Sequence, residues 1–217
     1  ASDDAAGLAI ANQLKARTKG FQQATRNAND SVSLIQTAEG GLNEVSNILI
    51  RLRELTIQAS SDTVGENERV LLNNEFQQLT TEIDRIADST TFNGTKIISG
   101  KNEKGVLDFQ IGIDNGDENR IQFDSEKANA HTSSIGIEGS GVAEKDQALE
   151  SIGQIDGAIN KVSSMRSEFG SIQTRINSTI RNLEVQAINH ESARSNIEDT
   201  DVAESVAKLS SAQIKKA

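Results

Sequence analysis

Four carboxylates lie within seven positions near the C-terminal end of the chain. They are Glu198, Asp199, Asp201 and Glu204, and His190 lies a short distance upstream. On a helix, residues three or four apart share a face, so Glu198, Asp201 and Glu204 could point the same way. Such a group can bind a divalent cation or exchange protons as a general acid and base. The cluster is therefore the first candidate for a metal or acid/base site.

The rest of the sequence favours a simpler role for this cluster. Carboxylates that bind a metal on helices usually have partners on a facing helix, together with His or further Glu. Residues 1–60 contain no matching acidic motif at helical spacing. Asp199 and Asp201 are residue types that cap helix N-termini. We therefore interpret the cluster as a solvated face or a helix boundary.

Other residues that could do chemistry lack a recognised spacing. His131 and His190 are the only histidines, and neither belongs to an HExxH or HxH zinc pattern. The sequence contains no phosphate-binding glycine loop and no GxSxG motif. The DNGDEN segment at 114–119 lacks the spacing of a calcium loop and is better explained as a turn. We expect no catalytic residue, no cofactor, no metal site and no enzymatic activity.

Composition narrows the class of protein further. The 217 residues are 35% hydrophobic, with no Trp, no Tyr and no Pro, which suits long helices joined by thin apolar seams. The absence of Cys excludes disulfides and thiolate metal sites. A net charge of −10 disfavours nucleic-acid binding, and no apolar run is long enough for membrane insertion. No signal peptide is visible, and the opening ASDDAAG indicates a piece of a longer chain.

Apolar residues at helical spacing predict a long helix over residues 1–61. From Ala24 to Leu52 the stripe advances by steps of four and three, which is typical of a helix lying along other helices. At roughly 1.5 Å per residue, such a helix would be on the order of 90 Å long. Gly40 and Gly41 weaken it, and we expect both to be tolerated inside the helix.

The remaining segments predict a mainly α fold with a small β region. A second helix is expected over 66–88, antiparallel to the first, and it ends before the Asn93-Gly94 turn signal. Alternating apolar residues predict a β-hairpin within 96–140. A second long helix follows over 144–198, and 199–217 is expected to form a linker and the start of a further helix. The two long helices must pack side by side in one elongated domain covering 1–217, because neither stripe can remain in water.

Several long segments make the chain similar to bacterial flagellin. DDAAGLAIANQL (3–14), TRNANDSVSLIQTAEGGLNEV (25–45), RLRELTIQAS (51–60) and TEIDRIADSTTFNGTKI (81–97) resemble the N-terminal half of that family. GSIQTRINSTIRNLE (170–184) and SARSNIEDTDVAESVAKLSSAQI (192–214) resemble its C-terminal half, in the same order. The match covers about three-quarters of the chain.

The resemblance implies a function that spacing alone does not provide. Flagellins polymerise into the extracellular filament that bacteria rotate to swim, and their inner-core domain has the order of elements predicted above. It implies other flagellin subunits as partners, together with the flagellar cap and hook-junction proteins. An export chaperone would serve the full-length chain, which leaves the cell through the flagellar type III pathway without a cleaved signal peptide. In the family, the segment containing Asp199 and Asp201 links the inner-core helix to a channel-lining helix, which implies capping and polar contacts between subunits.

The chain also departs from the family pattern. The terminal segments that form the central-channel coiled coil and the hypervariable outer domains are both missing, so we expect a minimal core that remains monomeric. A hook-filament junction protein or another flagellar axial protein is the alternative. A secreted carbohydrate-binding protein or a metal-dependent enzyme is a remote one.

The resemblance also implies candidate contact residues. In some bacteria the inner-core domain is recognised by Toll-like receptor 5, and the matching positions here are Arg51, Leu55 and Glu75. An Arg with a nearby Leu on an exposed helix face would suit an interface anchor. Arg51 and Leu55 could instead serve filament packing. Ile50 stands where well-recognised members carry Gln.

Overall fold

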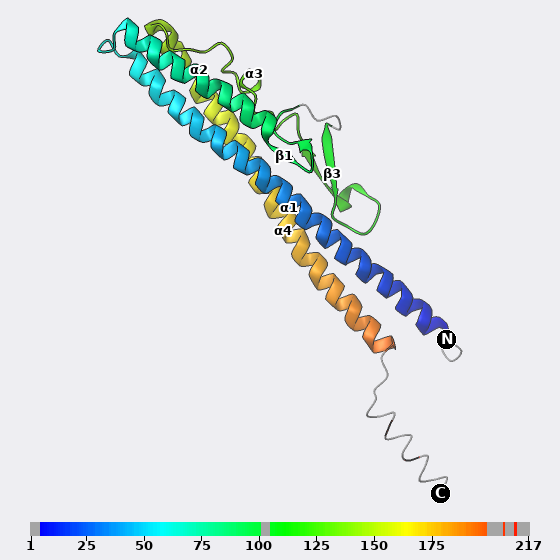
Figure 1. Ribbon diagram of the computed structural model, residues 1–217. Helices are drawn as coiled ribbons and strands as arrows, with labels where there is room; N and C mark the ends of the chain where they lie inside the picture. Colours follow the sequence, from blue (N-terminus) through cyan, green and yellow to red (C-terminus); the bar gives the residue numbers. More distant parts are fainter. Residues whose placement is uncertain (1–4, 101–104, 199–205, 207–210, 212–217) are drawn as a thin grey trace.

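The computed structural model describes residues 5–100 and 105–198, together with residues 206 and 211. The described part is a long rod made mainly of helix, with two small antiparallel strand pairs along one side (Figure 1). Its elements are α1 (Ala5–Ser60), α2 (Glu66–Ser89), β1 (Thr91–Phe92), β2 (Thr95–Lys96), β3 (Val106–Gln110), the 3-10 helix η1 (Asp117–Asn119), β4 (Arg120–Asp124), α3 (Thr132–Ile135) and α4 (Lys145–Glu198).

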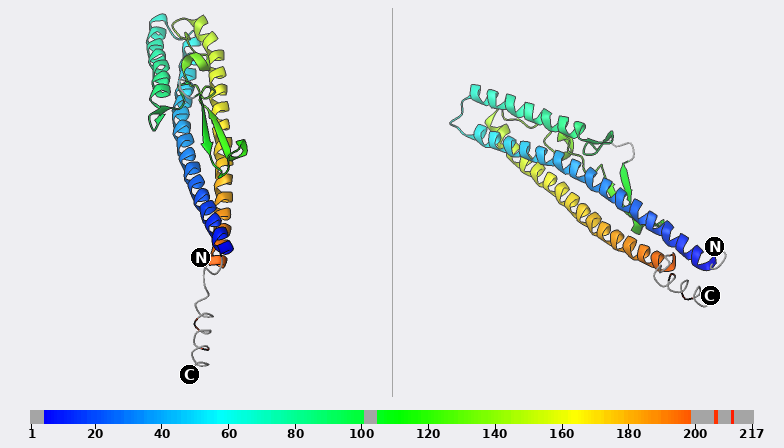
Figure 2. Two further views of the ribbon diagram at one scale, coloured as in Figure 1. Left: turned by 90° about the vertical axis from the view of Figure 1, so that its right-hand side faces the viewer. Right: turned by 60° about the horizontal axis from the view of Figure 1, so that its bottom comes forward.

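The rod is formed by α1 and α4, which run antiparallel and side by side along its length (Figures 1 and 2). The beginning of α1 and the end of α4 therefore lie at the same end, where Phe21 contacts His190. Near the other end, Arg53 of α1 pairs with Asp156 of α4. The predicted packing of the two long helices is confirmed, and α2 adds a third helix along the half that lies away from the termini.

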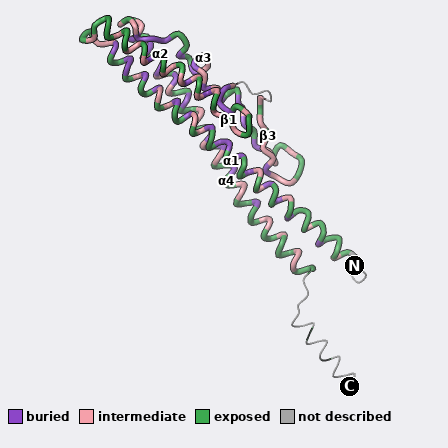
Figure 3. The backbone as a smooth tube through the Cα atoms, viewed as in Figure 1, coloured by how far each residue is buried: buried purple, intermediate pink, exposed green. Residues whose placement is uncertain are grey.

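The apolar stripe of α1 forms one side of the core. All nine stripe positions between Ala24 and Leu52 are buried, and the burial continues to Leu55 and Ala59. The facing positions of α4 are spaced by three, four or seven residues: Ala148, Ser151, Ile155, Ala158, Val162, Phe169, Ile172, Ile176 and Leu183. This buried line runs between the helices for most of their length (Figure 3). Two narrow helices in a rod can bury only such a seam, which explains the low content of aromatic residues.

The glycine pair lies inside α1, as predicted. A Cβ atom at Gly41 would lie 2.7 Å from Thr90 Oγ1 and 2.9 Å from Ile98 Cδ1, whereas a Cβ atom at Gly40 would meet nothing within 4 Å. Gly41 therefore lets α1 approach the segment that follows α2. The close packing explains one of the two glycines, and nothing in the structure explains the other.

The connection between α1 and α2 is a short turn with defined hydrogen bonds. The Arg69 guanidinium donates to the carbonyls of Ala59 (2.8 Å) and Ser61 (2.9 Å), which satisfies one acceptor in the last turn of α1 and one just after it. At the start of α2, the Glu68 carboxylate accepts a hydrogen bond from the Gly65 N–H at 2.7 Å. The turn therefore folds α2 back along α1, as the sequence predicted.

The β region contains more structure than the single predicted hairpin. β1 and β2 form a minimal hairpin around Asn93 and Gly94, whose φ angles of 49° and 76° fit the left-handed turn that Asn-Gly sequences favour. The predicted hairpin is β3–β4, paired from Val106↔Asp124 to Gln110↔Arg120. The DNGDEN segment lies in its loop, where it includes the short helix η1.

Phe123 joins this hairpin to the long helices. Its side chain is fully buried, and its ring centroid lies 5.3 Å from that of Phe169 in α4. Phe109 of β3 extends the cluster, with its centroid 6.4 Å from that of Phe123. The hairpin is therefore docked against α4 by an aromatic contact between residues far apart in the sequence.

Among the residues that the structure describes, no helix has the length and apolar character required to cross a membrane.

Candidate functional site

Only one carboxylate of the acidic cluster is described by the structure. Glu198 is the last residue of α4, and its carboxylate pairs with the Arg194 guanidinium. Arg194 also donates to Glu191 at 2.5 Å, and the hydrogen bonds to the two carboxylates raise its pKa above the ordinary value. Asp199, Asp201 and Glu204 lie outside the described residues. The one described carboxylate of the cluster therefore shares the Arg194 guanidinium with Glu191 on the same helix face.

Both histidines have structural neighbours. Within 5–100 and 105–198, no group of three or more His, Asp or Glu side chains converges as metal ligands would. His131 Nδ1 lies 3.0 Å from Asp84 Oδ1, and the same carboxylate accepts hydrogen bonds from the Thr132 N–H and hydroxyl, each at 2.9 Å. Asp84 therefore fastens the start of α3 to α2. His190 lies against the ring of Phe21 at 5.2 Å.

Arg51 and Glu75 connect α1 to α2 on the surface. Arg51 Nε donates to Glu75 Oε1 at 2.9 Å, and its Nη1 donates to Glu54 Oε2 at 3.0 Å. The hydrogen bonds to Glu54 and Glu75 raise the pKa of the Arg51 guanidinium, so it remains charged. The Arg51 and Glu75 side chains are 48% and 43% exposed. The structure brings these two predicted residues together and leaves both accessible to a partner.

Leu55 does not share that exposed face, so its prediction as an exposed anchor was wrong. The side chain is 0% exposed and belongs to the main core. The α1 stripe could have predicted this, because Leu55 follows Leu52 by three residues and precedes Ala59 by four. The apolar side chains that are exposed in this region are Ile50, Ile57 and, on α2, Val70 and Leu71.

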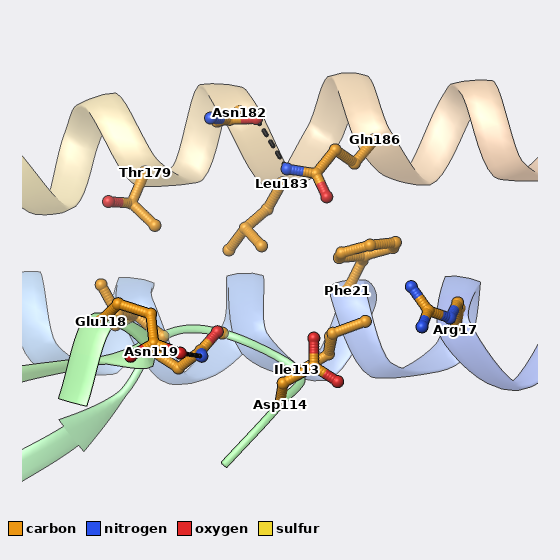
Figure 4. A pocket seen from close by; sticks show the side chains of 12 residues that line it. Arg17, Phe21, Ile113, Asp114, Glu118, Asn119, Thr179, Asn182, Leu183 and Gln186 are labelled. Atoms are coloured by element: carbon orange, nitrogen blue, oxygen red, sulfur yellow. Dashed lines mark hydrogen bonds between the residues drawn. The ribbon is translucent and has the colours of Figure 1, made fainter. Parts of the chain in front are cut away.

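A small pocket lies where the β3–β4 loop meets the two long helices (Figure 4). Its volume is about 290 Å³, and its walls are Arg17 and Phe21 of α1, the loop residues Ile111, Gly112, Ile113, Asp114, Glu118 and Asn119, and Thr179, Asn182, Leu183 and Gln186 of α4. Ile113 closes one side, because its Cγ2 lies 3.0 Å from the place where a Cβ of Gly20 would be. Its polar walls include the carboxylates of Asp114 and Glu118, the Arg17 guanidinium and the Thr179 hydroxyl. The pocket thus lies where α1, α4 and the β3–β4 loop meet.

Comparison with known families gives two matches that together cover most of the chain. Residues 1–103 match the bacterial flagellin N-terminal helical region, and residues 152–216 match the bacterial flagellin C-terminal helical region. The flagellin of Halalkalibacterium halodurans is 40% identical over 203 residues, which is 94% of this chain and 73% of the relative.

Solved structures agree with this assignment. The flagellin of Bacillus cereus is 29% identical, with a TM-score of 0.64 over 78% of this chain and 94% of its own. A putative flagellar hook-associated protein from Vibrio parahaemolyticus has a TM-score of 0.73 over 90% of this chain and 99% of its own. At 14% identity, however, that likeness shows the shared fold alone. The fold does not separate filament proteins from hook-associated proteins, so the assignment rests on the sequence matches to flagellins. The chain belongs to the bacterial flagellin family and is a structural subunit of the extracellular flagellar filament.

Proposed function

We propose that full-length copies of this protein assemble with one another through their helical faces to build the filament for swimming, and that the protein catalyses no reaction. The observation that carries the proposal is the paired-helix rod. Its apolar seam is satisfied within one chain, so the outer faces of α1, α2 and α4 remain available for neighbouring rods. Residues 1–217 would act as one elongated inner-core domain, with 199–217 as the link to further helix.

Electron microscopy of the full-length chain after seeded assembly tests this proposal. Monomers mixed with short filament seeds should elongate them, and seeds without added monomers provide the control. The proposal is rejected if the seeds do not lengthen at any monomer concentration at which the protein remains folded by circular dichroism.

Membership of the family also supports proposals about export. The full-length chain would pass through the flagellar type III pathway without a cleaved signal peptide, with the help of an export chaperone. The flagellar cap and hook-junction proteins would be its partners at the two ends of the filament. Asp199 and Asp201 would cap the helix boundary at the linker.

We further propose that the surface around Arg51 and Glu75 is recognised by Toll-like receptor 5. Their exposed ion pair across two helices supports this assignment, whereas Leu55 would act only by supporting the fold. A receptor reporter assay should show a lower response to Arg51→Ala than to the unsubstituted chain. Arg85→Ala is the matched control, because Arg85 is an exposed α2 arginine that pairs with its helical neighbour Glu82. No response to the unsubstituted chain would reject receptor recognition.

A further inference from the structure

The sequence contains two Asn-Gly pairs, Asn93-Gly94 and Asn115-Gly116. Each lies in the connection between two paired strands. In such a pair the glycine nitrogen can attack the amide carbon of the Asn side chain, because glycine has no Cβ to obstruct the approach. Both asparagines are exposed, so neither exposure nor the pair itself distinguishes them. Their surroundings in the folded chain do.

Asn93 is held in a conformation that opposes this attack. Its φ is 49°, and it is the only described residue other than glycine with a positive φ. Strands β1 and β2 are paired directly on either side of the two-residue turn that contains it. Ring closure needs rotation about the Asn93 Cα–C bond, and the left-handed turn conformation fixes that bond. The folded chain should therefore slow the attack at this position.

Asn115 has a cation on its side-chain oxygen. Nη2 of Arg120 donates a hydrogen bond to Asn115 Oδ1 at 3.2 Å. Nε of the same guanidinium donates to Gln110 Oε1 at 3.1 Å, which fixes its position. Attack on the amide carbon moves negative charge onto Oδ1, and a donor already placed there stabilises that charge. Arg120 therefore occupies the position of an oxyanion donor in this loop.

A carboxylate lies beside the glycine that would attack. A Cβ atom on Gly116 would lie 2.2 Å from Oε1 of Glu118, so this carboxylate occupies the space that a side chain at Gly116 would fill. The Asn119 side-chain amide donates to the same oxygen at 3.1 Å (Figure 4). The Gly116 carbonyl accepts from the Asn119 N–H, whereas the Gly116 N–H takes part in none of the described hydrogen bonds. Glu118 can therefore accept the proton of that N–H, directly or through one water.

We propose that the β3–β4 loop converts its own Asn115 to aspartate and isoaspartate. The Gly116 nitrogen forms a bond to Cγ of Asn115, and its proton passes to the Glu118 carboxylate. The Cγ–Nδ2 bond then breaks as Nδ2 takes up that proton and leaves as ammonia. Water hydrolyses one of the two C–N bonds of the resulting cyclic imide, which gives either product. Each chain reacts once, so this is a modification of the protein and not enzymatic turnover, and it does not depend on the proposed self-assembly.

The aspartate product fits the loop as it stands. Its carboxylate would lie where the Asn115 amide oxygen now accepts from Arg120, so a neutral acceptor is replaced by a charged one. The isoaspartate product instead lengthens the backbone between Asn115 and Gly116. Either product adds one negative charge to the exposed side of the loop.

Ageing of the folded chain in mildly alkaline buffer tests the proposal, with peptide mapping by mass spectrometry to measure the rate at each asparagine. Conversion at Asn115 should be at least about fivefold faster than at Asn93, which is the rate equivalent of one hydrogen bond. In guanidinium chloride that unfolds the chain, the two rates should come within about twofold of each other, because the contacts of the folded loop are lost. Equal rates in the folded chain, or a difference that persists on unfolding, would overturn the proposal.

Two variants separate the parts of the loop. Arg120→Met removes the donor and should slow conversion at Asn115 about fivefold without changing the rate at Asn93. Glu118→Gln removes the base and should also slow Asn115 while the Arg120 contact remains. Arg175→Met is the matched control, because Arg175 of α4 lines a pocket beside the same loop and makes no described hydrogen bond to Asn115, so both rates should stay unchanged. Hydrogen exchange of the β3–β4 amides verifies that the hairpin remains folded. If Arg120→Met and Glu118→Gln both convert Asn115 at the unsubstituted rate, the loop does not promote the reaction.

Discussion

Phe123→Ala should lower the free energy of unfolding by about 3–5 kcal/mol, the usual cost of truncating a buried Phe. The side chain is fully buried between the hairpin and α4, with Phe169 at 5.3 Å and Phe109 at 6.4 Å between ring centroids. Its removal leaves a cavity between the hairpin and α4. Denaturant unfolding followed by circular dichroism measures the loss.

The position of Phe123 also predicts where the loss should be seen. The long helices keep most of their seam, so the β3–β4 amides should lose protection from hydrogen exchange more than the centre of α1 does. Phe123→Leu is the control, and it should cost roughly 1–2 kcal/mol because it leaves a smaller cavity. An alanine variant as stable as the leucine variant would contradict the docking of the hairpin through this residue.

The helical rod could be predicted from the sequence because the spacing of apolar residues within each helix is enough to identify its buried face. Apolar residues at spacings of three and four mark the buried face whatever the partner is, and the stripe from Ala24 to Leu52 is buried throughout. The absence of Pro likewise permits helices of this length. The place where β3–β4 docks is different, because Phe123 and Phe169 belong to separate elements whose relative position depends on the whole fold. No local period encodes that contact.

The contacts of the candidate site residues likewise join residues that are far apart in the sequence. The hydrogen bonds of Asp84 with His131 and Thr132 join residues almost fifty positions apart. The sequence around Asp84 does not indicate these partners, nor does the sequence around them indicate Asp84. The resemblance to flagellin predicts Arg51 and Glu75 as contact residues. The structure explains why they form an ion pair, because α1 and α2 pack antiparallel. Leu55 is buried because it continues the apolar stripe of α1, and this spacing is present in the sequence.

The correction at Leu55 leads to the second large expected effect. Leu55→Ala should lower the free energy of unfolding by about 2–5 kcal/mol, since a fully buried Leu is truncated within the main core. Ile57→Ala, two residues further along the same helix, removes a side chain that is 47% exposed. Its effect should be within about 0.5 kcal/mol. Denaturant unfolding of the two monomers compares them directly.

The same two variants distinguish a loss of stability from the loss of a contact with a partner. If Leu55 only supports the fold, Leu55→Ala should lose assembly or receptor response in proportion to the unfolded fraction, and lowering the temperature toward the stability maximum should restore part of it. Ile57→Ala should instead leave the folded fraction unchanged at every temperature, because its exposed side chain supports no part of the core. A Leu55→Ala protein that is as stable as Ile57→Ala yet fails to bind would place Leu55 in the interface after all, and it would require the α1 seam to open when partners dock.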